Sequence, residues 1–328
     1  MLATNKLSPS VLTLNPRKEL ESIQEWVRAA VYMQLRRRGV VVGLSGGVDS
    51  SVTAAVCASA LGSSRVLGLI MPEEESSPES EYLGVLVAER LGIQVIKECV
   101  TPMLRACGCY ERRDRAIRSV LREYSPGWKS KIALPNMLHR DRYPVYSVCA
   151  LSPEGVEHRV RLTADASLEI VAATNFKQRA RKMVEYYHAD RVQYAVAGTP
   201  NRLEFDQGFF VKMGDGSADL KPIAHLYKTQ VYQMAEYLGI PPEVRLRPPT
   251  TDTYSLGQSQ EEFYFSIPLD KMDLCLYGKD HNIQPEAVAE AVDLTPDEVV
   301  RVYHQIDARR RMARYLHCQA LSLSCEGV

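Results

Sequence analysis

The residues from Val40 to Ser51 carry the clearest chemical pattern in this chain of 328 residues. An apolar run that ends at Gly43 has the composition of a buried strand, and the chain then turns at Ser45-Gly46-Gly47. The residues after the turn have helical composition. Backbone N–H groups at the start of a helix favour an anion, and the serine hydroxyls add donors. The carboxylate of Asp49 could hold a magnesium ion.

This turn is not a P-loop, because Gly-x-x-x-x-Gly-Lys-Ser/Thr is absent and the turn contains no lysine. Its order, Ser-Gly-Gly-x-Asp-Ser, resembles the signature of the ATP pyrophosphatases, whose loop holds the pyrophosphate that leaves during adenylation. The alternative is an ordinary glycine-rich turn between a strand and a helix.

A second polar block follows the apolar run that ends at Ala197. It comprises Gly198–Glu204, Gly208–Leu220 and Pro222–Gln230, and it is rich in glycine, lysine, threonine and carboxylates. A loop between buried elements that keeps so many charged groups is more easily explained as a site than as packing.

Together these motifs resemble those of NAD synthetase over most of residues 17–320, with residues 107–165 left out. The motifs are the first loop, Asn175-x-x-x-Arg179-x-Arg181, Gly198-Thr-x-Asn-x-x-Glu204, Gly208-Phe-Phe-x-Lys212-x-Gly-Asp-Gly-x-Ala-Asp219, Leu226-Tyr-Lys228-Thr-Gln and Pro248-Pro-Thr250. The block after Gly198 is the more diagnostic part, because many ATP pyrophosphatases share the first loop.

The resemblance implies a role for each matching residue. The phosphates of ATP would lie against Gly43, Leu44, Ser45, Gly46, Gly47, Val48, Asp49 and Ser50. Further ATP contacts would come from Thr199, Lys228 and Thr250. Mg²⁺ would bind Asp49 and Glu204, and the catalytic residues would be Asp49 and Lys228. Deamido-NAD would contact Arg179, Lys212 and Asp219.

The residue types suit the implied reaction, which is ATP-dependent amide formation. A carboxylate is a poor electrophile, so attack on the α-phosphate of ATP first gives an acyl-adenylate and pyrophosphate, and ammonia then displaces AMP. Charge builds on phosphates, which calls for N–H donors, lysine and magnesium rather than a covalent nucleophile. Taken singly, Glu204 and Asp219 could instead be helix-capping or surface carboxylates, Arg179 an exposed charge and Thr250 the start of a loop.

Three departures leave the acyl substrate open. Residues 107–165 replace a compact segment of the family, Ser255–Glu262 only loosely matches the family's Gln-x-Asp-Glu stretch, and Cys318 follows His317 where the family has a His-Lys pair. A related ligase could use the same machinery to amidate another carboxylate.

Two further classes remain as alternatives. A tRNA-modifying ATP pyrophosphatase would use the basic stretch from Tyr110 to Tyr143 to hold RNA, although a solvated face or a lining for an anionic ligand is favoured, and no RNA-binding signature accompanies it. A non-catalytic nucleotide sensor would not need Asp49, Glu204 and Lys228.

Composition narrows the class of protein. The formal net charge is zero, so no overall field attracts nucleic acid or membrane. No apolar run approaches the length of a membrane span, and residues 1–17 lack the features of a signal peptide. Of the eight cysteines, Cys107 and Cys109 form a C-x-C that could bind zinc, but reduced thiols in a cytoplasmic protein are the simpler interpretation.

The nitrogen source and the assembly also follow from the resemblance. Glutamine-dependent members carry a large nitrilase-like domain before the first helix, where this sequence has about sixteen residues. Free ammonia, or ammonia from a separate subunit, is therefore expected. The family is homodimeric, so we expect a homodimer.

Apolar periodicity predicts an α/β fold with a parallel sheet, and the resemblance implies a doubly wound sheet of the adenine nucleotide alpha hydrolase-like type. We expect a single domain over 1–328, with an insertion at 107–165 that carries a β-hairpin and a C-terminal helix and tail at 296–328. The expected strands are 40–43, 66–71, 93–96 and 191–197. The expected helices are 17–38 (closed by Gly39), 50–61, 82–91, 110–123, 168–188, 226–238, 285–292 and 295–316, with a mobile loop at 250–265.

Overall fold

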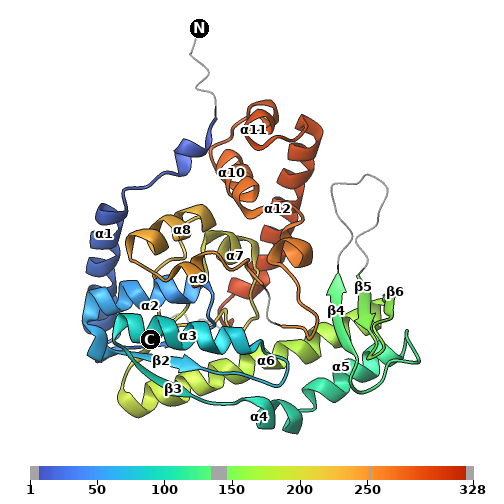
Figure 1. The fold of residues 1–328 in the computed structure, drawn as a ribbon. Helices are drawn as coiled ribbons and strands as arrows, with labels where there is room; N and C mark the ends of the chain where they lie inside the picture. The colour runs from blue at the N-terminus through green and yellow to red at the C-terminus, as the bar shows by residue number, and fades with distance from the viewer. Residues whose placement is uncertain (1–6, 134–145, 251–252, 323–328) are drawn as a thin grey trace.

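The computed structural model describes residues 7–133, 146–250 and 253–322. Its central sheet has four parallel strands in the order β3-β2-β1-β7 (Figure 1). The strands are β1 (Val40–Gly43), β2 (Val66–Ile70), β3 (Gln94–Lys97) and β7 (Ala195–Ala197). Every pair is parallel, and β1 lies between β2 and β7. The predicted parallel α/β fold is confirmed.

Alternation along β1 places successive valines on opposite faces of the sheet. Val40 and Val42 belong to a core shared with helices on one face, which are α1 (Pro16–Arg28), α2 (Val48–Leu61), α3 (Pro78–Leu91) and α8 (Lys228–Tyr237). Val41 belongs to the core on the other face, which is covered by α4 (Thr101–Ala106), α5 (Cys109–Arg118) and the long α6 (Ala164–Val192). Both faces are therefore buried, as a doubly wound sheet requires.

A separate antiparallel sheet lies within residues 107–165, beside one end of α6 (Figure 1). Its strands, in the order β4-β5-β6, are β4 (Lys129–Ala133), β5 (Ser147–Leu151) and β6 (Glu157–Arg161). The predicted hairpin around residues 152–155 is confirmed. Pro135, Pro144 and the end of the basic stretch lie outside the described residues.

The C-terminal part is helical. It contains α10 (Leu269–Asp280), α11 (Pro285–Val292) and α12 (Pro296–His317), which share one apolar core. Two short helices, α7 (Arg202–Gln207) and α9 (Pro242–Arg245), flank α8 in the sequence. The predicted start of the last helix is confirmed, because Thr295 caps α12 and Pro296 is its first residue.

Several sequence predictions were wrong in their boundaries. The first helix does not reach Gly39: α1 passes into a π-helical turn (Ala29–Gln34) and the left-handed backbone of Arg36 ends the run. Residues 191–192 belong to α6, and only Ala195–Ala197 pair with β1. The basic helix ends at Arg118 rather than Glu123, and Glu261–Phe265 form a short π-helix rather than loop. Helices α4, α7, α9 and α10 and strand β4 were not predicted.

Candidate active site

A cavity of about 560 Å³ lies where β1, β2 and β7 end. Parallel α/β sheets bind ligands at the carboxyl ends of their strands. Of the residues assigned to ATP and metal from the sequence, all but Gly46 line this cavity: Gly43, Leu44, Ser45, Gly47, Val48, Asp49, Ser50, Thr199, Glu204, Lys228 and Thr250. Stretches that are far apart in the sequence therefore meet at one site.

The turn after β1 is held by its own serines. The Ser45 backbone N–H donates to Ser50 Oγ at 3.3 Å, and Ser50 Oγ donates to the Gly47 carbonyl at 3.0 Å. No side chain caps the start of α2, and Gly47, Val48 and Asp49 line the cavity, so the first amides of this helix are available to a ligand there. Gly46 turns away from the cavity with φ +73°, packed against α3. The arrangement suits an anion.

Two carboxylates and one lysine meet opposite the turn. Lys228 Nζ, which is almost fully buried, forms an ion pair with Asp49. Asn201 joins both carboxylates, because its side-chain Nδ2 donates to Asp49 Oδ1 at 2.9 Å and its backbone N–H donates to Glu204 Oε2 at 3.2 Å. Gln260 donates to the other oxygen of Glu204 at 3.0 Å. The donor set is oxygen-rich and charged.

The surroundings of Glu204 and Lys228 raise the pKa values of both groups. Burial of the carboxyl, together with the nearby charge of Asp49, raises the pKa of Glu204 to about 8. Burial opposes the charge of Lys228, but the carboxylates of Asp49 and Glu204 raise its pKa. The positive charge of Lys228 therefore does not offset burial and the charge of Asp49, and Glu204 keeps its proton to a higher pH than an ordinary glutamate does.

A residue that the sequence did not single out positions Lys228. Asp273, fully buried on α10, accepts hydrogen bonds from the backbone N–H groups of Lys228 at 3.2 Å and Thr229 at 2.7 Å. These are the first amides of α8, so Asp273 caps this helix from another element. The partners are far apart in the sequence, and no spacing rule could have indicated them.

The three residues assigned to deamido-NAD do not line the cavity of about 560 Å³. Arg179 is exposed on α6 and donates to the Lys212 carbonyl at 3.2 Å. Lys212 Nζ donates to the carbonyls of Tyr315 and Cys318, at 2.8 and 3.1 Å, at the end of α12. Asp219 accepts from the Val196 N–H of the edge strand β7 at 2.8 Å and from the Tyr186 hydroxyl of α6 at 3.3 Å. The structure thus joins Arg179 to Lys212 and leaves Asp219 apart.

A second cavity, of about 650 Å³, lies beside the end of α12. Its lining includes Arg202, Phe205, Arg314, His317 and Cys318. His317, to which no role was given, donates from Nε2 to the Phe205 carbonyl at 2.9 Å. Most charged residues of the wall are basic, although Asp206 also lines it and forms an ion pair with Arg310.

Other cavity residues were missed or named only as part of a motif. Arg181, rather than Arg179, is the arginine of the Asn175 motif that reaches the first cavity, and its Nε donates to the Met71 carbonyl at 3.1 Å. Arg247 precedes the two prolines and donates to Ser80 Oγ at 3.0 Å. The only sequence signal for Arg247 was a positive charge next to two prolines, and that pattern was interpreted as a chain break rather than as part of a site.

The basic stretch is partly neutralised inside the protein. Arg113 is buried and paired with Glu75, and Lys131 is paired with Glu262. The seven cysteines in the described ranges are free, and Cys109 Sγ donates to the Ala173 carbonyl at 3.2 Å. The same ranges contain no group of three or more His, Cys, Asp or Glu that could hold a metal ion, and no helix in them is long and apolar enough to cross a membrane.

Comparison with known proteins gives a consistent family. The family model described as NAD synthase matches residues 19–152 and 151–313. The chain is 55% identical over 311 residues to the NH(3)-dependent NAD(+) synthetase of Mesorhizobium japonicum, covering 95% of this chain and 98% of that protein. It is 53% identical to the protein of the same name from Rhizobium meliloti, covering 94% and 92% respectively.

Solved structures agree on the fold. An NMN synthetase from Francisella tularensis matches with a TM-score of 0.66 at 20% identity, over 95% of this chain and 99% of that one. An NH3-dependent NAD synthetase from Campylobacter jejuni, in complex with nitrate, matches with a TM-score of 0.62 at 18% identity, over 95% and 100%. At such identities the likeness concerns the fold alone.

Proposed function

Since the chain belongs to the NAD synthase family, we propose that it makes NAD from deamido-NAD, ATP and ammonia. The nicotinate carboxylate attacks the α-phosphorus of ATP, and the bond to pyrophosphate breaks. Ammonia then attacks the acyl carbon of the adenylate, AMP leaves with the bonding electrons, and a proton is lost from nitrogen. The products are NAD, AMP and pyrophosphate.

The observation that supports this proposal best is the convergence on one cavity of the Ser-Gly-Gly turn, Asp49, Glu204 and Lys228. The amides at the start of α2 would bind the phosphates. Lys228 would neutralise the charge that develops on the leaving pyrophosphate, and Asp49 would hold the side-chain ammonium group of Lys228 in position. Preorganised charge of this kind is the main requirement of phosphate chemistry.

The donor set also fits a magnesium ion. Asp49 and Glu204 are bridged by Asn201, and the raised pKa of Glu204 marks a carboxyl that a cation would help to ionise. Mg²⁺ commonly takes one or two carboxylates plus substrate phosphates and water, so two protein ligands suffice. When bound, the ion would draw charge from the phosphate oxygens. We propose Asp49 and Glu204 as its ligands.

Arg179, Lys212 and Asp219 are proposed to bind deamido-NAD. The second cavity supports this assignment, since Lys212 is attached to the end of α12 that lines it and its basic wall would suit a dinucleotide. Cys318 replaces the lysine of the family's His-Lys pair, so this chain would contact the dinucleotide there with one cation fewer.

The remaining partners are proposed on family grounds. Ammonia would arrive free or from a separate ammonia-supplying subunit, and the protein would be a homodimer. Free thiols in the described residues support a cytoplasmic location, because disulfides are rare in a reducing compartment.

The main assay is release of AMP and pyrophosphate from ATP, Mg²⁺ and ammonium, with and without deamido-NAD. We expect release only with deamido-NAD. Nicotinate mononucleotide, which lacks the adenylate half, is the competing acid. Release of AMP with nicotinate mononucleotide but not with deamido-NAD, or in the absence of both acids, would contradict deamido-NAD as the substrate. The protein would then be a related amide-forming ligase.

The role of Asp49 has its own variant. Asp49→Ala should reduce pyrophosphate release by about a hundredfold or more, because it removes a preorganised charge at the site. Asp270→Ala, on the exposed start of α10, is the control and should be unaffected. Normal turnover in the first variant, with the fold intact by circular dichroism, would remove Asp49 from the site.

A further inference from the structure

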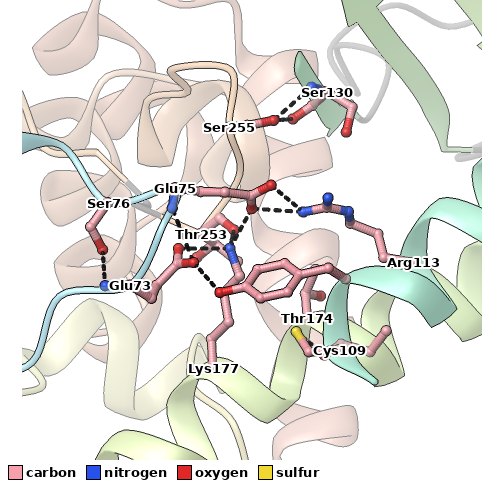
Figure 2. A network of polar contacts seen from close by, with 12 residues as sticks. Glu73, Glu75, Ser76, Cys109, Arg113, Ser130, Thr174, Lys177, Thr253 and Ser255 are labelled. Atoms are coloured by element: carbon pink, nitrogen blue, oxygen red, sulfur yellow. Dashed lines mark hydrogen bonds and ion pairs between the residues drawn. The ribbon is translucent and has the colours of Figure 1, made fainter. Parts of the chain in front are cut away.

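A fully buried ammonium lies behind the first cavity and is not used by the proposed chemistry. Lys177, on α6, has no exposed surface. Its Nζ donates to Glu73 Oε1 at 2.9 Å, Glu75 Oε2 at 2.6 Å and the Thr253 carbonyl at 2.8 Å (Figure 2). An ammonium has three donors, and three acceptors meet it here. Two of the acceptors follow β2, and the third belongs to a segment 76 residues away.

The carboxylates extend this cluster into residues 107–165. Arg113, buried on α5, donates through one nitrogen to both oxygens of Glu75 at 2.6 and 2.7 Å. Tyr110, on the same helix, donates its hydroxyl to Glu73 Oε2 at 2.6 Å. Despite burial, Lys177 and Arg113 lower the pKa of Glu75, so the carboxylate stays charged between two cations.

The same residues 107–165 also bind the segment after Thr253. The Ser130 N–H on β4 donates to Ser255 Oγ at 2.8 Å, and the Leu256 N–H donates to the Ser130 carbonyl at 3.2 Å. Further along β4, Gln258 Nε2 donates to the Ile132 carbonyl at 2.8 Å. Residues 255–258 are thus attached to β4 by one backbone hydrogen bond and by the side chains of Ser255 and Gln258.

This segment is part of the cavity wall. Thr253, Tyr254 and Gln260 line the cavity, and Gln260 also reaches Glu204. The loop after β2 lines it too, through Ser76 and Ser77. The Lys177 cluster therefore connects two stretches of cavity wall, and β4 supports one of them from outside. Burying several charges to make such a connection is costly unless all are paired, which is the case here.

We infer that Lys177 is a positioning residue for the nucleotide, and that α5 and β4 serve the active site by holding segment 253–260 in place through this cluster and the edge of β4. The inference rests on the proposed function, since it takes the first cavity to be the ATP site. Loss of either attachment lowers the fraction of molecules whose cavity wall is formed. Binding of ATP favours the formed wall, so a variant needs a higher ATP concentration than the unchanged protein to reach the same formed fraction.

Lys177→Met tests the buried attachment and the pair Ser255→Ala/Gln258→Ala tests the β4 attachment without touching a charge. We expect KM for ATP to rise about tenfold in each, because apparent affinity falls with the competent fraction, while kcat and KM for deamido-NAD change less than about threefold. Hydrogen exchange at residues 253–262 should be faster than in the unchanged protein, and ATP should restore it. Arg105→Met is the matched control, since it removes an exposed ion pair to Glu74 in the same loop.

The outcomes separate the inference from simple destabilisation and from the proposed function. A variant that merely folds less well loses kcat per mole of chain with KM for ATP unchanged, and that result overturns the inference. An equal rise in KM for Arg105→Met overturns it as well. Should Lys177→Met not fold, the Ser255/Gln258 variant decides by the same criterion. Absence of AMP release by the unchanged chain contradicts the proposed function instead, and ATP affinity by calorimetry then tests the inference.

Discussion

Gly46 shows how a single residue determines the phosphate loop. Its φ of +73° is unfavourable for any residue with a side chain, and an added Cβ would lie 2.5 Å from the Ser80 carbonyl oxygen of α3. The added Cβ and the Ser80 oxygen cannot separate without moving the packed backbone to which each is attached. The cavity-lining amides depend on this close approach.

Gly46→Ala should therefore lower the free energy of unfolding by about 2–4 kcal/mol, the sum of the left-handed backbone cost and the overpacking cost. Urea unfolding measures it. Gly47→Ala is the control: Gly47 has φ −93°, and its added Cβ would meet only Ser45 Oγ, at 3.3 Å. Equal losses in the two variants would show that the contact with α3 does not limit the loop.

Asp273 links stability to pH. Burial raises the pKa of its carboxyl from 3.8 to about 6, although the backbone N–H groups of Thr229 and Lys228 oppose the rise. The folded chain consequently holds a proton there that the unfolded chain releases. The contribution of Asp273 to stability is complete below pH 3.8 and is lost as the pH rises through about 6.

Asp273→Asn removes this titration. The difference in free energy of unfolding between the unchanged protein and the variant should fall by about 3 kcal/mol from roughly pH 4 to pH 7, and stay constant above that. Urea unfolding of both proteins across this range gives the difference directly. A difference that does not vary with pH would mean that Asp273 titrates normally in the folded protein.

The residues differ in how far the sequence could predict them. Asp49, Glu204 and Lys228 lie in short motifs whose local backbone creates the site, so the sequence indicated them and the structure brings them together. Asn201 is part of such a motif as well. Asp273 and Gln260 act only through partners on distant elements, and the chemistry of a carboxylate or an amide is the same wherever it lies.

At the scale of elements, the strands β1, β2 and β3 and two glycine-closed helices were predictable, whereas β4 and the start of β7 were not. Gly62 and Gly92 end α2 and α3 with positive φ, as their type favours. Gly39 does not end a helix, because the π-helical turn shifts the register and Arg36 takes the left-handed conformation. Its lack of a side chain serves packing instead, since a Cβ would lie 2.3 Å from the Arg65 carbonyl oxygen.

The cap of α12 is an element whose stability can be measured alone. Thr295 Oγ1 accepts from the Glu298 N–H at 3.3 Å, and Glu298 Oε2 accepts from the Thr295 N–H at 2.8 Å. Thr295→Ala should lower the free energy of unfolding by about 1 kcal/mol. Gln284→Ala, at the start of α11, is the control because its side chain makes no cap bond. A loss of equal size there would contradict the cap as the cause.

At the scale of the whole molecule, the sheet explains why the site was visible in the sequence and its support was not. Strands β1 and β7 are neighbours in the sheet, so their carboxyl ends bring residues 49 and 204 together at the edge where parallel sheets bind ligands. The docking of β4 on residues 255–258 joins stretches 125 residues apart, through hydrogen bonds that leave no pattern in either. An inserted segment therefore looked separate from the site that it contacts.

The residues around the first cavity also bear on whether the protein takes its nitrogen from ammonia or from glutamine. Release of ammonia from glutamine needs an activated nucleophile with a partner base. Within the described residues, neither cysteine nor histidine lines the first cavity, so the serines that line it have no histidine base there to activate them. We therefore expect ammonium salts to support AMP release with deamido-NAD, and glutamine to support none above background. The rate at fixed total ammonium should rise with pH as more ammonia is present, and an equal rate with glutamine would require a nucleophile that this cavity lacks.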